Sequence, residues 1–168
     1  MPRPPKRGSA RAAEDAAGDV VRVCLLGDLQ IHRGAQELKL PPSRKTRALL
    51  AFLLLTGRTF RREKLCDLFW DVADDPRGAL RWSLSKIRPL VDEPGRARLV
   101  ADRATVMIDT EGMDVDVLRL RSRVREMGVS GTPAAELLAW AAAFRGELLE
   151  GLDLREFDDY QAWCVAER

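Results

Sequence analysis

One predicted helix face has the chemistry needed to bind a phosphate backbone and base edges. The segment GALRWSLSKIRPLV (78–91) has apolar residues at 80, 84, 87 and 91, which is the spacing of one side of an α-helix. The opposite side carries polar and aromatic side chains, namely Arg81, Trp82, Ser85, Lys86 and Arg88, with Arg77 just before it. Arginine and lysine bind phosphates and guanine edges, and an aromatic ring can contact thymine methyl groups. This face therefore predicts either nucleic-acid contact or, through Trp82, contact with another protein.

The sequence gives little support for an enzyme or a metal site. His32 is the single histidine, so a nucleophile–histidine pair has few candidates, and no Cys or carboxylate partner stands at ligand spacing from it. No GxxxxGK[ST] phosphate-binding loop occurs. The carboxylate pairs Asp74–Asp75 and Asp158–Asp159 fall in a loop and on a surface helix, where solvated charge is expected. We predict no catalytic residue, no metal and no cofactor.

Cysteine usage and hydropathy favour a cytoplasmic protein. The three cysteines, Cys24, Cys66 and Cys164, are scattered and form no CxxC pair, which suggests reduced thiols. The longest apolar run, ALLAFLLL (48–55), is too short to span a bilayer, and the N-terminus lacks the apolar core of a secretory signal. We therefore expect no membrane association.

The net charge of +2 conceals a division of the 168-residue chain. Residues 1–19 are rich in Pro, Gly, Ala and charge, and we expect a disordered basic tail. Residues 20–110 carry 17 basic and 11 acidic residues, whereas residues 111–168 carry 7 and 12. A basic module attracts phosphate backbones, and an acidic helical one more often meets protein or solvent. The charge division therefore predicts two modules with different partners.

The basic module is expected to begin with three short antiparallel strands within 20–40, the third around Leu38 and Leu40. A helix over 41–57 should follow, with Ser43 as N-cap and Gly57 at its end. A second helix within 59–75, opened by Thr59 or Arg61, and the helix 77–91 come next. We expect Pro89 to kink or fray the last turn of 77–91. A β-hairpin over 97–110 has Arg103 at its tip. This order is that of a winged helix-turn-helix.

The acidic part is predicted to be helical over 114–127, 132–149 and 154–168. Thr132 and Pro133 are expected at the N-cap and first position of the second of these helices. The alanines at 139 and 141–143 would allow close helix approach, as in stacked helical hairpins. Because a stack of fewer than about three repeats is rarely stable alone, we expect this helical segment to be incomplete.

Several segments together resemble a known family. LLGDLQIHRGAQELKLPPSRKTRALLAFLLL, RREKLCDLFW, ALRWSLSKIRPLV and LVADRATVMID resemble the OmpR/PhoB-type winged-helix DNA-binding domain, in the variant of the Streptomyces antibiotic regulatory protein (SARP) family. MDVDVLRL and FRGELLEGLDLREFDDYQAW resemble the start of that family's bacterial transcriptional activator domain, which is TPR-like. The resemblance covers about residues 21–168. Similar N-terminal modules also head large multidomain ATPase regulators.

The resemblance implies an α+β winged helix-turn-helix, with an N-terminal β-sheet, three helices and a C-terminal β-hairpin wing, followed by an all-α TPR-like segment. It places helix 77–91 in the major groove and Arg103 of the wing at the minor groove. It also implies phosphate contacts from Arg44, Lys45, Thr59 and Arg61. The acidic loop 71–76, with Asp71, Asp74 and Asp75, corresponds to the part of relatives that contacts RNA polymerase. Relatives bind direct repeats in tandem, which implies a homodimer on DNA.

The sequence therefore predicts a sequence-specific regulator of transcription that binds double-stranded DNA, and an activator in particular. The alternative is a protein-interaction or regulatory module of a larger signalling protein, in which the winged helix no longer binds DNA and Trp82 anchors a partner. The basic charge of residues 20–110 favours the first hypothesis.

Overall fold

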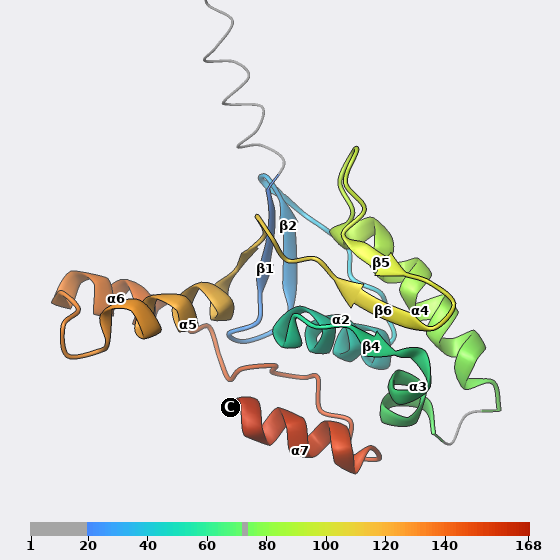
Figure 1. The fold of residues 1–168 in the computed structure, drawn as a ribbon. Coiled ribbons are helices and arrows are strands. Elements are labelled where there is room, and N and C mark those ends of the chain that lie inside the picture. The colour runs from blue at the N-terminus through green and yellow to red at the C-terminus, as the bar shows by residue number, and fades with distance from the viewer. Residues whose placement is uncertain (1–19, 72–73) are drawn as a thin grey trace, which may run out of the picture.

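The computed structural model describes residues 20–71 and 74–168, and it contains two small β-sheets surrounded by helices (Figure 1). The predicted tail 1–19 lies outside the described residues. The N-terminal sheet has the strand order β3-β2-β1-β7, with β1 Val21–Cys24, β2 Gln30–Arg33, β3 Gln36–Glu37 and β7 Asp114–Val115. The first three strands pair antiparallel as predicted, but the third pairs at Gln36 and Glu37 instead of Leu38 and Leu40. Strand β7 runs parallel to β1, with Val23 opposite Val115.

Helix α2 (Arg44–Thr56) lies at the centre of the core, and its ends are set by local signals. The Ser43 hydroxyl accepts a hydrogen bond from the Thr46 amide at 3.3 Å, and Gly57 ends the helix at φ 57°. These are the N-cap and left-handed C-cap that the sequence predicts. Every residue from Ala48 to Leu55 is buried, so the helix is enclosed on nearly all sides.

The next two helices, α3 (Arg62–Trp70) and α4 (Pro76–Val91), form the predicted helix-turn-helix. The segment before α3 is a short strand, β4 (Phe60–Arg61), and Arg61 precedes the helix without a side-chain cap. Asp75 caps α4 by accepting a hydrogen bond from the Gly78 amide at 2.8 Å, and Pro76 occupies the first turn, where its missing N–H costs nothing.

Pro89 does not fray the end of α4, contrary to the sequence-based expectation. The helix continues to Val91, and the Asp92 amide donates to the Arg88 carbonyl at 2.9 Å. Leu90 and Val91 are buried, and their packing holds the last turn in place. Arg33 also donates to the carbonyl oxygens of Pro89 and Asp92, so carbonyl groups at the helix end have partners outside it.

The predicted wing is present as β5 (Leu99–Ala101) and β6 (Thr105–Ile108), with Arg103 exposed in the turn between them. Strand β4 pairs with β6, which gives a second sheet of order β4-β6-β5. This sheet joins the wing directly to the segment that leads into α3. The Asp102 carboxylate stabilises the turn by accepting hydrogen bonds from the amides of Thr105 and Ala104, and these bonds lower the pKa of Asp102.

The C-terminal part departs most from prediction. Helix α5 (Asp116–Met127) begins two residues later than expected, because residues 114 and 115 form β7. Helix α6 (Ala134–Ala143) has Pro133 at its N-cap, so the prediction of Thr132 as N-cap and Pro133 as first helical residue is wrong. The predicted helix 132–149 is also wrong at its end, because α6 ends at Ala143. Residues 144–157 instead form a return segment that lies against residues 25–28, just after β1. The helix predicted over 154–168 therefore starts later, as α7 (Asp158–Glu167).

This return segment is held by backbone hydrogen bonds to the residues that follow β1. The amides of Arg145 and Leu149 donate to the carbonyls of Leu26 and Leu25, each at 3.0 Å. Gly27 lies under the segment with φ 113°, and a Cβ there would lie 3.0 Å from the Gly146 nitrogen. The chain crossing thus requires glycine at position 27.

Helix α7 packs on the winged helix and belongs to the same hydrophobic core. The rings of Tyr160 and Phe69 have centroids 5.0 Å apart, and those of Trp163 and Phe52 are 4.8 Å apart. Figure 1 shows α7 beside α3 and beneath α2. The boundary at residue 110/111 stays a prediction, but segments on both sides of it share one core.

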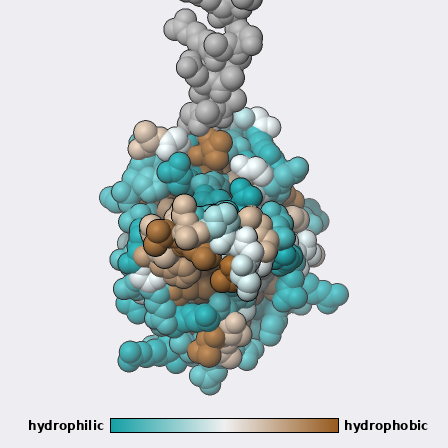
Figure 2. Space-filling view, turned by 90° about the vertical axis from the view of Figure 1, so that its left-hand side faces the viewer, coloured by the Kyte–Doolittle hydropathy of each residue, from teal (hydrophilic) through white to brown (hydrophobic). Residues whose placement is uncertain are grey.

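Helices α5 and α6 project away from the rest of the molecule (Figure 1). No residue of α6 is buried, and the alanines at 139 and 141–143 are exposed or half-buried. Figure 2 looks onto this end and shows hydrophobic side chains gathered there. The close helix approach predicted at these alanines is therefore not found within residues 20–71 and 74–168. The TPR-like character of this segment stays a prediction.

Candidate nucleic-acid interface

An open groove of about 1050 Å³ separates α4 from the wing, and arginines dominate its lining. Five come from four different elements, namely Arg61, Arg62, Arg77, Arg81 and Arg103. Four of these were predicted from the sequence, and the fold brings them together from positions 61 to 103. Strand β4 supplies the first arginine, the start of α4 supplies two, and the wing turn supplies the last. The groove therefore concentrates positive charge between a helix and a hairpin.

Arg62 is a groove residue that was not predicted from the sequence, although it stands beside Arg61. Its Nε donates to the Asp102 carbonyl oxygen at 2.7 Å, and its backbone amide donates to the Ala104 carbonyl at 2.8 Å. Arg62 thus ties the start of α3 to the wing turn. The signal that could have found it is the basic run RREK, which opens the helix.

Acidic side chains at the groove pair only loosely with its arginines. Arg77 lies 3.5 Å from Glu63, and Arg81 lies 3.9 Å from Asp75, and all four side chains are largely exposed. Ion pairs of this kind contribute about 0–1 kcal/mol, so they exchange readily for contacts to an anion.

The outer face of α4 presents the other predicted side chains beside the groove. Trp82 is 47% exposed, and the Lys86 ammonium lies 5.5 Å from the centre of its ring. Leu80, Leu84 and Ile87 are buried on the opposite side, as the helical wheel predicts. The face thus combines one large apolar surface, the Trp82 ring, with the Lys86 cation. The cation is close enough to the ring for both to contact the same base or phosphate.

Two side chains of this face are engaged within the protein. The Ser85 hydroxyl donates to the Trp82 carbonyl at 2.6 Å, so it has used its donor inside the helix. Arg88 pairs with Asp92 at 3.2 Å at the end of α4. Both side chains remain exposed. Arg81, Trp82 and Lys86 have weaker contacts within the protein, so they are more available to a ligand.

The structure does not bring Arg44 and Lys45 into the groove. They line a separate hollow of about 250 Å³ with residues 153–157 of the return segment. The Lys45 ammonium lies 4.1 Å from the centre of the Phe157 ring, and such a contact holds the cation against the protein. Thr59 is exposed before β4, where its hydroxyl donates to the Met107 sulfur at 3.4 Å.

The acidic loop 71–76 joins α3 to α4 at one end of the helix-turn-helix. Asp71, Asp74 and Asp75 are exposed, and positions 72 and 73 lie outside the described residues. Asp75 has a structural role as the N-cap of α4. Within residues 20–71 and 74–168, the side chains of Asp71 and Asp74 take part in no hydrogen bond or ion pair.

Within residues 20–71 and 74–168, the side chains form no cluster of three or more metal-ligating residues. No helix in this part of the chain is both long and apolar enough to cross a bilayer. Cys66 and Cys164 are buried, and their burial raises the pKa of both thiols.

No family model and no curated protein matches this chain. Among solved structures, that of Mycobacterium tuberculosis EmbR in complex with a low-affinity phosphopeptide is similar, with a TM-score of 0.65 and 20% sequence identity. The likeness covers 88% of this chain and 41% of that one, so this chain spans less than half of the EmbR structure. At this identity the likeness shows a shared fold alone.

Proposed function

We propose that this chain, with its winged-helix architecture, is a transcriptional regulator that binds double-stranded DNA sequence-specifically. The observation that carries the proposal is the groove in which arginines from β4, α4 and the wing converge beside the exposed face of α4. In this proposal α4 enters the major groove and Arg103 of the wing reaches the adjacent minor groove. Arg61 and Arg77 contact phosphates, and Arg81 and Lys86 contact base edges.

The proposal extends to partners. Two copies bind direct repeats about one helical turn apart, as the resemblance implies. The acidic loop between α3 and α4 faces RNA polymerase and makes the protein an activator, because its exposed carboxylates fit a protein surface better than a phosphate backbone. The proposal includes no catalytic residue and no cofactor, because the groove is lined mainly by cations. Its two carboxylates, Glu63 and Asp102, pair with Arg77 and with the backbone of the wing turn.

Binding is expected to depend steeply on salt. If the groove and the α4 face neutralise about four to eight phosphates, log K should fall against log salt with a slope of roughly −4 to −7. A high-affinity duplex is first selected from a random pool. The protein is then titrated into this labelled duplex at five salt concentrations, and binding is followed by fluorescence anisotropy. A slope near zero would exclude docking of the basic groove on a phosphate backbone.

The second candidate function is a protein-interaction module, and the exposure of Trp82 favours it. Trp82→Ala separates the two functions because the side chain lies outside the core. If Trp82 meets DNA, we expect affinity for the selected duplex to fall by about 1–3 kcal/mol while the thermal midpoint stays within about two degrees of the wild type. Melting by circular dichroism accompanies the binding titration.

Two other outcomes of the Trp82→Ala experiment have clear meanings. A midpoint that falls together with affinity would show that Trp82 is part of the core after all. No change in either quantity would favour the protein-interaction function. Lys86→Ala is the matched control on the same face. Relative to the wild type, this variant should lose more affinity at low salt than at high salt, as expected when a charge contact is removed.

A further inference from the structure

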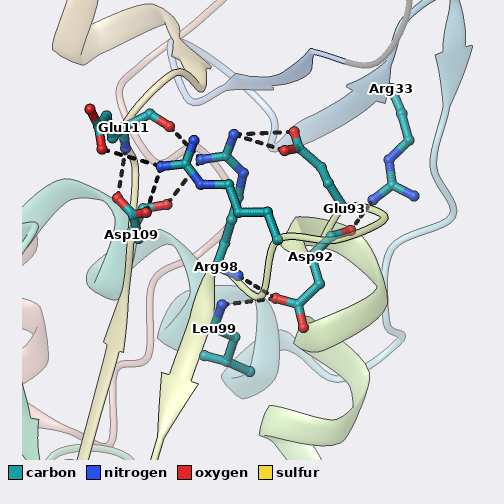
Figure 3. Close-up of polar contacts among 8 residues, drawn as sticks. Arg33, Asp92, Glu93, Arg98, Leu99, Asp109 and Glu111 are labelled. Atoms are coloured by element: carbon teal, nitrogen blue, oxygen red, sulfur yellow. Dashed lines mark hydrogen bonds and ion pairs between the residues drawn. The ribbon is translucent and has the colours of Figure 1, made fainter.

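A buried arginine joins the end of α4 to the base of the wing. Arg98 is 2% exposed and lies in the connection between the two elements (Figure 3). Its Nη2 donates to both carboxylate oxygens of Glu93, at 3.2 and 3.0 Å. An ionised side chain is rarely buried unless several partners offset the loss of its hydration. The partners of Arg98 therefore show which parts of the protein it joins.

The partners of Arg98 come from both sides of the connection. Glu93 lies just past the end of α4, whereas the Nη1 of Arg98 donates to the carbonyl oxygens of Asp109 and Glu111, at 3.3 and 2.5 Å, just past β6. One planar guanidinium thus holds the helix end and the exit of the hairpin in a fixed relation. Lysine cannot reproduce this geometry, because its donors radiate from a single atom.

A second carboxylate completes the junction at the entry of the hairpin. Asp92 Oδ1 accepts hydrogen bonds from the backbone amides of Arg98 and Leu99, at 2.9 and 2.8 Å. The first residue of β5 is therefore fixed to the residue that ends α4 (Figure 3). By contrast, the Arg96 side chain bonds, among the residues that the structure describes, to Asp109 and Glu111, both on the wing side.

The opposite end of the wing is held by Arg62, as described above. The hairpin is therefore fixed at its base to α4 and at its turn to the start of α3. These two attachments set the width of the groove, because α4 and the wing form its two sides.

We propose that Arg98 is a positioning residue for the wing, which holds Arg103 at the correct distance from the α4 face for both to contact one duplex. This inference rests on the proposed function for its consequence on DNA, but the positioning itself is a property of the free protein. The test therefore has one measurement with DNA and one without it.

The measurement without DNA is hydrogen exchange of the full chain. In Arg98→Lys, amides of residues 97–110 should exchange about tenfold faster, whereas those of α2 should keep their protection. Arg96→Lys is the matched control, since it alters a neighbouring arginine that does not reach α4, and it should change exchange of the wing by less than about twofold. Equal acceleration in the wing and in α2 would show that Arg98 contributes to global stability only, and an unchanged wing would also overturn the inference.

The measurement with DNA is a double-mutant cycle on the selected duplex. Arg98→Lys should weaken binding about tenfold alone, but less than about twofold when Arg103 is already alanine, because the wing contact is then absent. When Arg98→Lys is combined with Arg81→Ala, the fold-losses in affinity of the two single variants should multiply, because Arg81 does not depend on the wing. If the affinity losses of Arg98→Lys and Arg103→Ala also multiply, the positioning role is overturned.

A milder variant keeps the test decisive if Arg98→Lys does not fold. Glu93→Gln preserves an acceptor and removes one charge, and it should give the same pattern with a smaller change in exchange. Failure of the wild-type chain to bind any duplex would refute the proposed function, while the exchange measurement would still decide whether Arg98 positions the wing.

Discussion

Replacing both Arg77 and Arg81 by alanine is expected to weaken DNA binding by about 2–4 kcal/mol, a loss of affinity of roughly 30- to 1000-fold. Both guanidinium groups line the groove, and both belong to the first turns of α4, which approach the bases in this docking geometry. Their ion pairs with Glu63 and Asp75 are exposed, so the thermal midpoint should hardly change. Anisotropy titrations and melting curves measure the two effects separately.

The matched control for this variant removes the same charge elsewhere. Arg119→Ala with Arg123→Ala changes the net charge equally, but both side chains are exposed on α5, on the projecting arm of the molecule. We expect this variant to lose less than about fivefold in affinity, through long-range attraction alone. Equal losses in the two double variants would mean that overall charge, and not the groove, determines binding.

Asp116→Ala is expected to destabilise the protein by about 3 kcal/mol or more. The Asp116 side chain is buried and accepts hydrogen bonds from the backbone amides of Leu25, Leu26 and Val117, at 2.9, 3.0 and 2.7 Å. Alanine would leave these buried donors unpaired, and each unpaired donor costs about 1–3 kcal/mol. Urea unfolding followed by circular dichroism gives the free energy directly.

Two neighbouring variants show whether buried hydrogen bonds explain the Asp116 effect. Asp116→Asn keeps one acceptor oxygen and should lie between the wild type and Asp116→Ala. Asp114→Ala removes a carboxylate that pairs with the exposed Arg22 and Arg119, and it should cost less than about 1 kcal/mol. A cost for Asp116→Ala as small as that for Asp114→Ala would contradict the argument.

Sequence patterns predicted best those elements whose ends depend on nearby residues. Helix α2 has its capping serine and terminal glycine within its own segment, and the buried stripe of α4 follows from helical periodicity alone. The outward direction of Trp82 follows from the same periodicity. Among the groove arginines, Arg77 and Arg81 could be named in advance because they lie on α4, and Arg103 because it lies at a turn. Arg61 could be named only through the family resemblance, since it lies on β4.

Features that depend on distant residues were not predictable in this way. Strands β4 and β7 have two residues each, and only their partners in the sheets define them. The Ala- and Leu-rich pattern of 132–149 continues past residue 143, but Leu148 and Leu149 are buried where they pair with Leu26 and Leu25, just after β1, and not by a helix face. Arg98 stands in a polar loop sequence typical of solvated charge, and only the surrounding carbonyls and Glu93 make it a buried link.

The docking of α7 on α2 and α3 affects how the protein folds during synthesis. Phe52 and Phe69 leave the ribosome early, whereas their ring partners Trp163 and Tyr160 emerge near the end of this sequence. The bonds from Leu25 and Leu26 to Asp116 likewise close loops of 91 and 90 residues. Such distant contacts slow folding and delay burial of the apolar surface. The nascent region 20–110 therefore exposes aromatic surface until α7 emerges, and a chaperone has most to protect during this interval.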